Sequence, residues 1–218
     1  MSRNKYPEET YNLIIEVSTK LFLEKGYEHT TVQDIINNLG GLSKGAIYHH
    51  FKSKEDILIA ASDKLFNDNA LSKKWTTTKF DTTLSGSEKI KKMLIDSIDD
   101  PQEQQFRAFG IDLKKVPYML SDLLVRSVLQ IAPKVFQPVI EQGIADGSIK
   151  TSFPKELAEL IALLANIWLN PLVFRMSDKE LRRKFNVIRD MTLALGFDIE
   201  DIYQSLEEMN KKINNKTI

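Results

Sequence analysis

The chain has 218 residues, with 30 basic and 30 acidic side chains, 42% hydrophobic residues and no cysteine. It is long enough to bury a core, its balanced charge gives no global sign of nucleic-acid binding, and the lack of cysteine excludes disulfides and thiol catalysis. The N-terminus lacks the apolar core of a secretion signal, and no run approaches the roughly 18 apolar residues of a membrane span. We therefore expect a cytoplasmic protein with no membrane partner.

The first predicted element is a helix that begins near Pro7 and ends near Gly26. Proline suits the first turn of a helix, and glycine is a common residue at its C-terminal end. Apolar or small side chains recur at helical spacing between these residues and predict one buried face: Ile14, Val17, Ser18, Leu21 and Phe22.

Two short helices are predicted next, within residues 31–56. Thr31 and Asp34 have the spacing of a capping box, so one helix should begin there. It should end at Gly40 and Gly41, because one of two adjacent glycines can adopt the left-handed conformation that closes a helix. Ser43 can then cap a second helix, and Ser53 with Asp56 repeats the capping pattern for a third.

The second of these helices predicts an exposed basic surface. Its spacing places Lys44, Tyr48 and His49 outward, and Leu42, Ile47 and Phe51 inward. No acidic residue occurs from position 35 to position 54, a stretch that contains three lysines. A helix, a tight glycine turn and a second helix with small and basic residues at its start are typical of the DNA-binding helix-turn-helix. The alternative is an ordinary helical hairpin.

The residues from Ser43 to Glu55, SKGAIYHHFKSKE, resemble the signature of the TetR family of bacterial transcriptional regulators. Residues 10–60 resemble the whole DNA-binding domain of that family, and residues 142–148 resemble a turn common in its second domain. Asp34 and Ser43 lie one residue farther apart than is usual in the family, which lengthens the turn. The resemblance implies an all-α fold, with a three-helix helix-turn-helix domain over residues 1–52 and a larger helical ligand-binding and dimerisation domain over 53–218.

The DNA contacts expected of this domain fall into two groups. Lys44, Gly45 and Ala46 lie in the first turn of the recognition helix, where lysine can donate to guanine, alanine can meet a thymine methyl and glycine permits close approach. The resemblance implies phosphate contacts at positions whose side chains each offer a donor: Thr31, Ser43, Tyr48, His49, His50 and Lys54. For His50, partial burial is the alternative.

The remainder of the chain also follows a helical pattern. A helix is expected over residues 53–69, whereas Trp75 to Ser87 is rich in threonine and serine and predicts a loop or frayed segment. Three prolines should break or kink the middle helices and so leave room for a cavity: Pro117, Pro133 and Pro138. The polar tail from Glu207 is expected to fray.

Two apolar stripes near the C-terminus have two possible roles. Both could be core of a single chain, or, as the resemblance implies, they could form a four-helix dimer interface with a second copy. A helix-turn-helix reader usually binds as a pair, which favours a homodimer. The interface residues would be Leu157, Leu160, Ile161 and Leu164 on one helix, and Leu181, Phe185, Ile188, Thr192 and Leu195 on the other.

For the small-molecule effector we expect a pocket of large or amphipathic residues on the helices that the resemblance places around a cavity, although any of them could be core. These are Phe106, Phe109, Tyr118, Leu129, Phe136, Asn166 and Trp168. Adjacent His49 and His50 should point about 100° apart, so no metal is expected, and no cofactor.

An enzyme is disfavoured, because no histidine lies outside the DNA-binding region and residues 40–45 lack the order of a phosphate-binding loop. The function predicted is a DNA-binding transcriptional regulator, a repressor released from a palindromic operator in double-stranded DNA by a ligand. The alternative is a DNA-binding adaptor or organising protein of the same fold without a ligand.

Overall fold

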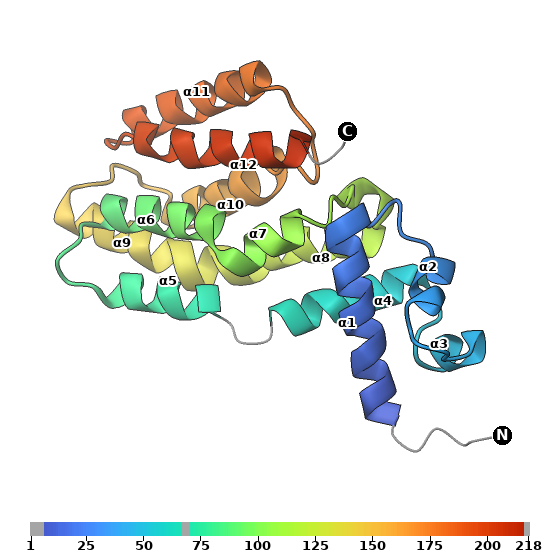
Figure 1. The fold of residues 1–218 in the computed structure, drawn as a ribbon. Helices are drawn as coiled ribbons and strands as arrows, with labels where there is room; N and C mark the ends of the chain where they lie inside the picture. The colour runs from blue at the N-terminus through green and yellow to red at the C-terminus, as the bar shows by residue number, and fades with distance from the viewer. Residues whose placement is uncertain (1–6, 67–69, 216–218) are drawn as a thin grey trace. The chain divides into compact units, whose positions relative to one another are not determined.

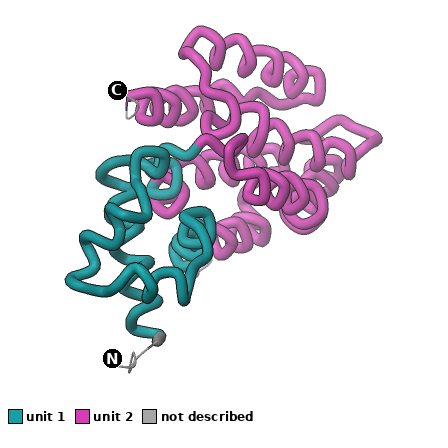
Figure 2. The backbone as a smooth tube through the Cα atoms, turned by 90° about the vertical axis from the view of Figure 1, so that its right-hand side faces the viewer, with its two compact units in different colours: residues 1–68, 105–111 teal, residues 69–104, 112–218 magenta. Residues whose placement is uncertain are grey.

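The computed structural model describes residues 7–66 and 70–215, and every regular element in these two ranges is a helix (Figure 1). The predicted all-α class is therefore confirmed. The chain divides into two compact units, coloured separately in Figure 2. Unit 1 comprises residues 1–68 and 105–111, and unit 2 comprises residues 69–104 and 112–218. This division differs from the predicted boundary at 52/53, because the fourth helix packs on the first, and a later segment returns to unit 1.

Unit 1 is built around its first helix. Its elements are α1 (Pro7–Lys25), α2 (Val32–Asn37), α3 (Lys44–His50), α4 (Lys54–Leu65) and the last residues of α7 (Pro101–Arg107). The expected face of α1 is buried, with Ile14, Ser18 and Phe22 at 0% exposure. Gly26 ends this helix with a φ of 82°, as predicted. The returning segment completes the core, because the ring of Phe109 lies 5.7 Å from that of Phe22.

Unit 2 packs its helices around one hydrophobic core that extends from α6 to α12. In Figure 1, α11 and α12 lie side by side, and they also contact each other directly. Its elements are α5 (Ala70–Phe80), α6 (Gly86–Asp99), η1 (Leu113–Lys115), α8 (Pro117–Arg126), η2 (Ser127–Phe136), α9 (Gln137–Asp146), α10 (Pro154–Leu163), η3 (Leu164–Trp168), α11 (Asp178–Ala194), η4 (Glu200–Ile202) and α12 (Tyr203–Asn215).

Helix α5 occupies much of the segment that was predicted to be a loop, so that prediction was wrong for its first part. The indole N–H of Trp75 donates to the carbonyl of Met93 at 3.0 Å, and its ring packs against Phe136. Thr76 and Thr77 donate their hydroxyls to carbonyls one turn earlier, which satisfies them within the helix. Tertiary packing therefore outweighs the low helix propensity of threonine.

The C-terminal tail is helical in α12 up to Asn215, so the expected fraying from Glu207 was also wrong over that range. Leu206 and Ile213 are buried on one side of α12. Asn210 is 1% exposed and donates to the carbonyl of Met176 at 3.1 Å. The polar composition of the tail concealed an amphipathic helix.

The prolines of the middle segment do not interrupt it. Pro117 stands at the start of α8, where its missing N–H is not needed. Pro133 lies within η2, a π-helical stretch whose wider turn changes the hydrogen-bonding pattern around it. The result is a continuous helical run over Pro117–Asp146. By length and composition this 30-residue run could cross a membrane, whereas the sequence analysis expected no such run. Within its 18-residue apolar window, 28% is buried inside the chain.

Candidate DNA-binding surface

The recognition segment is held in place by local hydrogen bonds. Thr31 and Asp34 form the predicted capping box, and Ser53 forms the equivalent box with Asp56. Both Gly40 and Gly41 adopt positive φ, at 63° and 98°. The chain between α2 and α3 thus turns through two left-handed residues where one was expected, which accommodates the additional residue of this turn.

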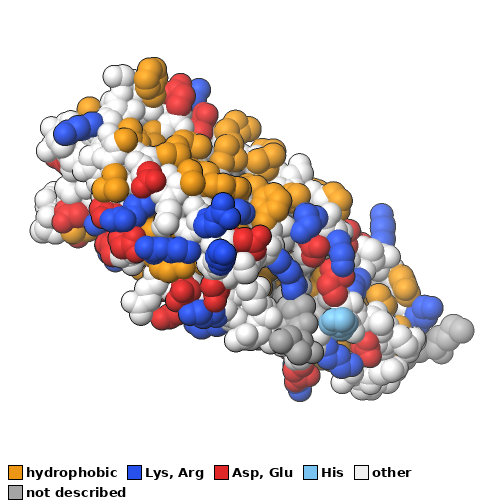
Figure 3. Space-filling view, turned by 90° about the horizontal axis from the view of Figure 1, so that it is seen from above, with side chains coloured by type: hydrophobic (Ala, Val, Ile, Leu, Met, Phe, Trp, Pro, Cys, Tyr) orange, Lys and Arg blue, Asp and Glu red, His pale blue; other side chains and the backbone are white. Residues whose placement is uncertain are grey.

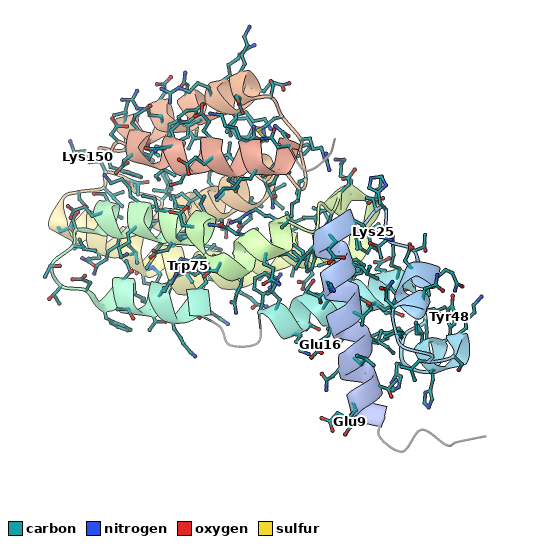
Figure 4. The ribbon with its side chains drawn as sticks, in the orientation of Figure 1. Glu9, Glu16, Lys25, Tyr48, Trp75 and Lys150 are labelled. Atoms are coloured by element: carbon teal, nitrogen blue, oxygen red, sulfur yellow. The ribbon has the colours of Figure 1, made fainter. Side chains whose placement is uncertain are left out.

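Helix α3 presents one face to solvent and buries the other, as predicted. The hydroxyl of Ser43 accepts the N–H of Ala46 at 3.3 Å and so caps the helix. Ile47 and Phe51 are buried at 1% and 4% exposure, whereas Tyr48 is 46% exposed (Figure 4). The Lys44 ammonium lies 5.7 Å from the centre of the Tyr48 ring. This arrangement holds a cation at the N-terminal end of an exposed helix.

The two histidines at the end of α3 do not diverge as expected. Their rings are stacked, with centroids 5.1 Å apart, and the rings of His50 and Tyr11 of α1 form an edge contact with centroids 6.1 Å apart. His49 is exposed, but His50 is partly buried, and its Nε2 has no hydrogen-bond partner among the described residues. Burial, and then the nearby His49, lower the pKa of His50 from its usual 6.5. His50 is thus suited to packing α3 against α1.

The side chain of Thr31 is hydrogen bonded within the helix that it caps. Its hydroxyl donates to the Asp34 carboxylate at 2.6 Å, and the same hydroxyl accepts the Asp34 N–H at 3.0 Å. The hydroxyl and the backbone N–H of Thr31, which both donate to this carboxylate, and then Lys25 at 3.2 Å, lower the pKa of Asp34 to about 2. The Thr31 hydroxyl, which was expected to contact a DNA phosphate, is therefore bound to the Asp34 carboxylate instead.

The ammonium of Lys54 is also hydrogen bonded within unit 1. Its ammonium donates to the carbonyls of Tyr27 at 2.8 Å and Thr30 at 3.0 Å, and lies 4.2 Å from the centre of the Tyr27 ring. These bonds join the start of α4 to the turn between α1 and α2. The placement gives Lys54 a structural role in addition to the phosphate contact that the resemblance implied.

The seven predicted pocket residues are divided between the two units. Phe106 and Phe109 belong to unit 1, where their rings pack on each other at 5.8 Å. In unit 2, Tyr118 and Leu129 are exposed and Phe136 is buried in the core. The other two predicted residues, Asn166 and Trp168, both lie on η3.

The predicted dimer stripes lie partly in the core of the chain itself. Phe185 is 1% exposed and packs on Tyr203 of α12 at 5.1 Å between ring centroids. Four further residues of the two stripes are buried: Leu157, Leu181, Ile188 and Thr192. Three more are partly buried and pack on the same core: Ile161, Leu164 and Leu195. Leu160 is exposed, at 36%.

The sequence patterns missed exposed apolar residues on the outer side of α11. Val187 is 50% exposed and Met191, one turn later, is 41% exposed. Hydrophobic side chains gather over a broad area of the face seen in Figure 3. Their signal in the sequence was weak, because Val187 and Met191 lie outside the apolar stripe that runs from Leu181 to Leu195. No group of three metal-binding side chains occurs within residues 7–66 and 70–215.

Comparison with known proteins gives a consistent result for the surface described above. Residues 14–61 match the family of bacterial regulatory proteins named tetR. The HTH-type transcriptional repressor KstR2 of Mycolicibacterium smegmatis is 24% identical over 157 residues, which cover 69% of this chain and 73% of KstR2. The HTH-type transcriptional repressor DhaR of a Mycobacterium species is 29% identical over 149 residues, covering 66% of this chain and 72% of DhaR.

A similar fold occurs among solved structures. A TetR-family transcriptional regulator from Pectobacterium atrosepticum superposes with a TM-score of 0.59 and 20% identity, covering 90% of this chain and 98% of that one. At this identity the likeness concerns the fold. It extends over nearly the whole chain, beyond the matched N-terminal segment.

Proposed function

The chain belongs to the TetR family of transcriptional regulators, and from this we propose that it is a dimeric repressor released from its operator by a small molecule. The observation that carries the proposal is the capped helix α3, which buries Ile47 and exposes Lys44, Tyr48 and His49 within the segment that matches the family. The names of KstR2 and DhaR favour repression over activation. A regulator that reads chromosomal DNA acts in the cytoplasm.

In this proposal α3 enters the major groove and its first turn reads base edges. Lys44 donates to guanine acceptors, Gly45 permits close approach, and Ala46 lies against a thymine methyl. Tyr48, His49 and Ser43 donate to phosphates on either side. Phosphate contacts by Thr31, His50 and Lys54 have less support, because each of these side chains is engaged in packing or hydrogen bonding within unit 1.

The partner in the dimer is a second copy of the chain. Supporting this, α10 and α11 retain exposed apolar side chains after the core of unit 2 is complete, namely Leu160, Val187, Met191 and Leu193. A solvent-exposed apolar surface of this kind is characteristic of an interface. Two copies related by a twofold axis would present two α3 helices to the two halves of a palindromic operator.

Selection from a pool of random DNA duplexes tests this function. The full chain should enrich a palindromic sequence, and sizing should show two chains bound to each duplex. Lys44→Ala should reduce enrichment, whereas Lys179→Ala, an exposed lysine on α11, should leave it unchanged. Failure of the wild-type chain to enrich any sequence would refute the proposal.

The alternative, an adaptor that binds DNA without a ligand, makes a different prediction about coupling. If a ligand releases the operator, the operator must weaken ligand binding by the same factor, and such coupling is typically about 1 to 3 kcal/mol. Equal ligand affinity with and without operator would exclude release by that ligand, and a chain that binds operator but no small molecule would support the adaptor.

A further inference from the structure

Helices α8 and η3 contact each other in unit 2, yet neither contains a buried residue. This is unusual for apolar segments in a close-packed interior, where the side chains between neighbouring helices lose access to solvent. Leu120 and Leu123 on α8 are partly exposed, as are Leu163 and Ile167 on or beside η3. The two segments therefore offer apolar surface to a small ligand.

One polar pair lies beside this apolar surface. Ser127 is 0% exposed, and its hydroxyl donates to the carbonyl of Leu123 at 2.7 Å. The side-chain amide of Asn166 donates to the same hydroxyl at 3.1 Å. This bond uses one N–H of Asn166, and its second N–H and its Oδ1 have no hydrogen-bond partner among the described residues. Asn166 can thus donate to or accept from a ligand.

Both members of this pair stand in π-helical segments. Ser127 opens η2 and Asn166 lies in the middle of η3. Short π-helical insertions are rare and occur frequently at functional sites, because they turn side chains away from the positions that a regular α-helix would give them. The two distortions meet at the Ser127–Asn166 hydrogen bond.

The charged side chains near the pair are engaged with other groups. Residues 163–168 contain no ionisable side chain, and Asp122 and Arg126 of α8 form an ion pair with each other at 2.8 Å. The Lys184 ammonium donates to the carbonyl of Trp168, at the end of η3, at 2.9 Å. A charged ligand group that loses hydration at Asn166 would therefore find no unengaged opposite charge among these side chains.

We propose that the effector is an uncharged, mainly apolar molecule whose hydroxyl or carbonyl group hydrogen bonds to Asn166, with its apolar part between α8 and η3. The inference rests on the proposed function, because it names the class of ligand that a released repressor would bind. It differs from the pocket expected from the sequence, because Phe106, Phe109 and Phe136 take no part in it.

Three probes of equal chain length test the proposed class: octan-1-ol, octanoate and octylammonium. Octan-1-ol should raise the melting temperature of the full chain, because a ligand bound only by the folded state stabilises it. The two charged probes should bind at least about tenfold more weakly, since an unpaired charge loses more than 1.4 kcal/mol on burial. Equal or stronger binding of either charged probe would overturn the proposed class.

Variants locate the site. Asn166→Ala should reduce the affinity for octan-1-ol, and Asn186→Ala, an exposed asparagine on α11, should not. Asn166→Asp should shift preference toward octylammonium, because the new carboxylate supplies the missing opposite charge. Unchanged affinities in both Asn166 variants would overturn the site. A loss of dimers on Leu129→Glu would also overturn it, because a second copy would then cover the start of η2, which follows α8 directly.

DNA binding is measured on the same samples, so that failure of the proposed effector class can be distinguished from failure of the proposed repressor function. A chain that enriches an operator but ignores octan-1-ol leaves the regulatory function intact and removes this effector class. A chain that binds octan-1-ol through Asn166 but enriches no operator supports the ligand site and refutes the repressor.

Discussion

Two lysines of unit 1 have opposite surroundings, and this difference decides what each can contribute to DNA binding. Lys44 is exposed beside Tyr48, and its ammonium has no hydrogen bond to another residue in the described ranges. Lys54 donates to two backbone carbonyls and lies over an aromatic ring. A free ammonium can meet a base or phosphate without breaking existing bonds, whereas an engaged one must exchange them.

For Lys44→Ala we expect a loss of about 1 to 3 kcal/mol per specific contact on the selected operator, with a smaller loss on random DNA. The reason is that a bidentate contact to guanine is lost only where that guanine occurs. Binding curves on matched specific and random duplexes measure the difference. An equal loss on both would indicate that Lys44 contacts phosphate.

Lys54→Ala is expected to lower the free energy of unfolding by about 1 to 3 kcal/mol, because two carbonyls lose a charged donor. Chemical denaturation measures this loss, and the slope of log affinity against log salt should stay the same. A slope shallower by about 2 for the dimer, without loss of stability, would restore the phosphate role implied by the resemblance.

Thr31 should control the ionisation of Asp34. The pKa of this carboxyl is lowered from 3.8 to about 2, first by the Thr31 hydroxyl and backbone and then by Lys25. Because the folded pKa lies below the unfolded one, the stabilisation is present above about pH 4 and is lost as the pH falls toward 2. Thr31→Val should raise the Asp34 pKa in an NMR titration, and an unchanged value would contradict the hydrogen-bond assignment.

At the scale of elements, the packing of α6 against α9 depends on two glycines. A Cβ at Gly86 would lie 2.4 Å from the Cα of Gly143 and 2.7 Å from the carbonyl oxygen of Val139. In the structure, the Asp146 carboxylate accepts the N–H of Gly86 at 2.8 Å, and the Ser148 hydroxyl accepts the N–H of Ser87. The segment over residues 142–148, which resembles a turn of the family, thus caps α6 and permits its close approach.

Gly86→Ala should therefore be strongly destabilising, by at least the roughly 1 to 3 kcal/mol typical of overpacking, because backbone atoms of α9 must move. Gly45→Ala is the matched control, since its Cβ would be 3.7 Å from the nearest atom, the Ser43 hydroxyl. Thermal melts of both variants measure the contrast. Similar melting temperatures for the two variants would contradict the close approach.

At the scale of the whole molecule, burial decides which residues of α11 can contact a second copy of the chain. One side of this helix packs on α12 through Phe185, and another side exposes Val187 and Met191. A side chain already buried in the core of its own chain contributes fold stability and cannot be exchanged for contacts with a partner. The exposed side is therefore the one to test.

Val187→Asp combined with Met191→Asp should give folded monomers that no longer bind the operator tightly. Phe185→Asp should instead unfold the chain, because it places an unpaired charge in the core. Sedimentation at micromolar concentration and circular dichroism separate these outcomes, with Ser72→Asp on α5 as a surface-charge control. A double variant that remains dimeric would exclude this side of α11.

The sequence by itself determined the helix-turn-helix. Its signals are local: Thr31 with Asp34, Ser43 with Ala46, and the paired glycines all act within a few residues of each other, so spacing alone specifies the hydrogen bonds. The family resemblance follows from the same contiguous residues. The all-α class is likewise readable from helical periodicity.

Only the tertiary structure decided the roles that depend on distant partners. Lys54 meets carbonyls 27 and 24 residues away, and Trp75 holds α5 through a carbonyl 18 residues away. The Ser127–Asn166 hydrogen bond spans 39 positions and joins two π-helical segments. Such contacts leave no local pattern, because a side chain's partner across the core is fixed by how whole helices pack and by nothing in its neighbouring sequence.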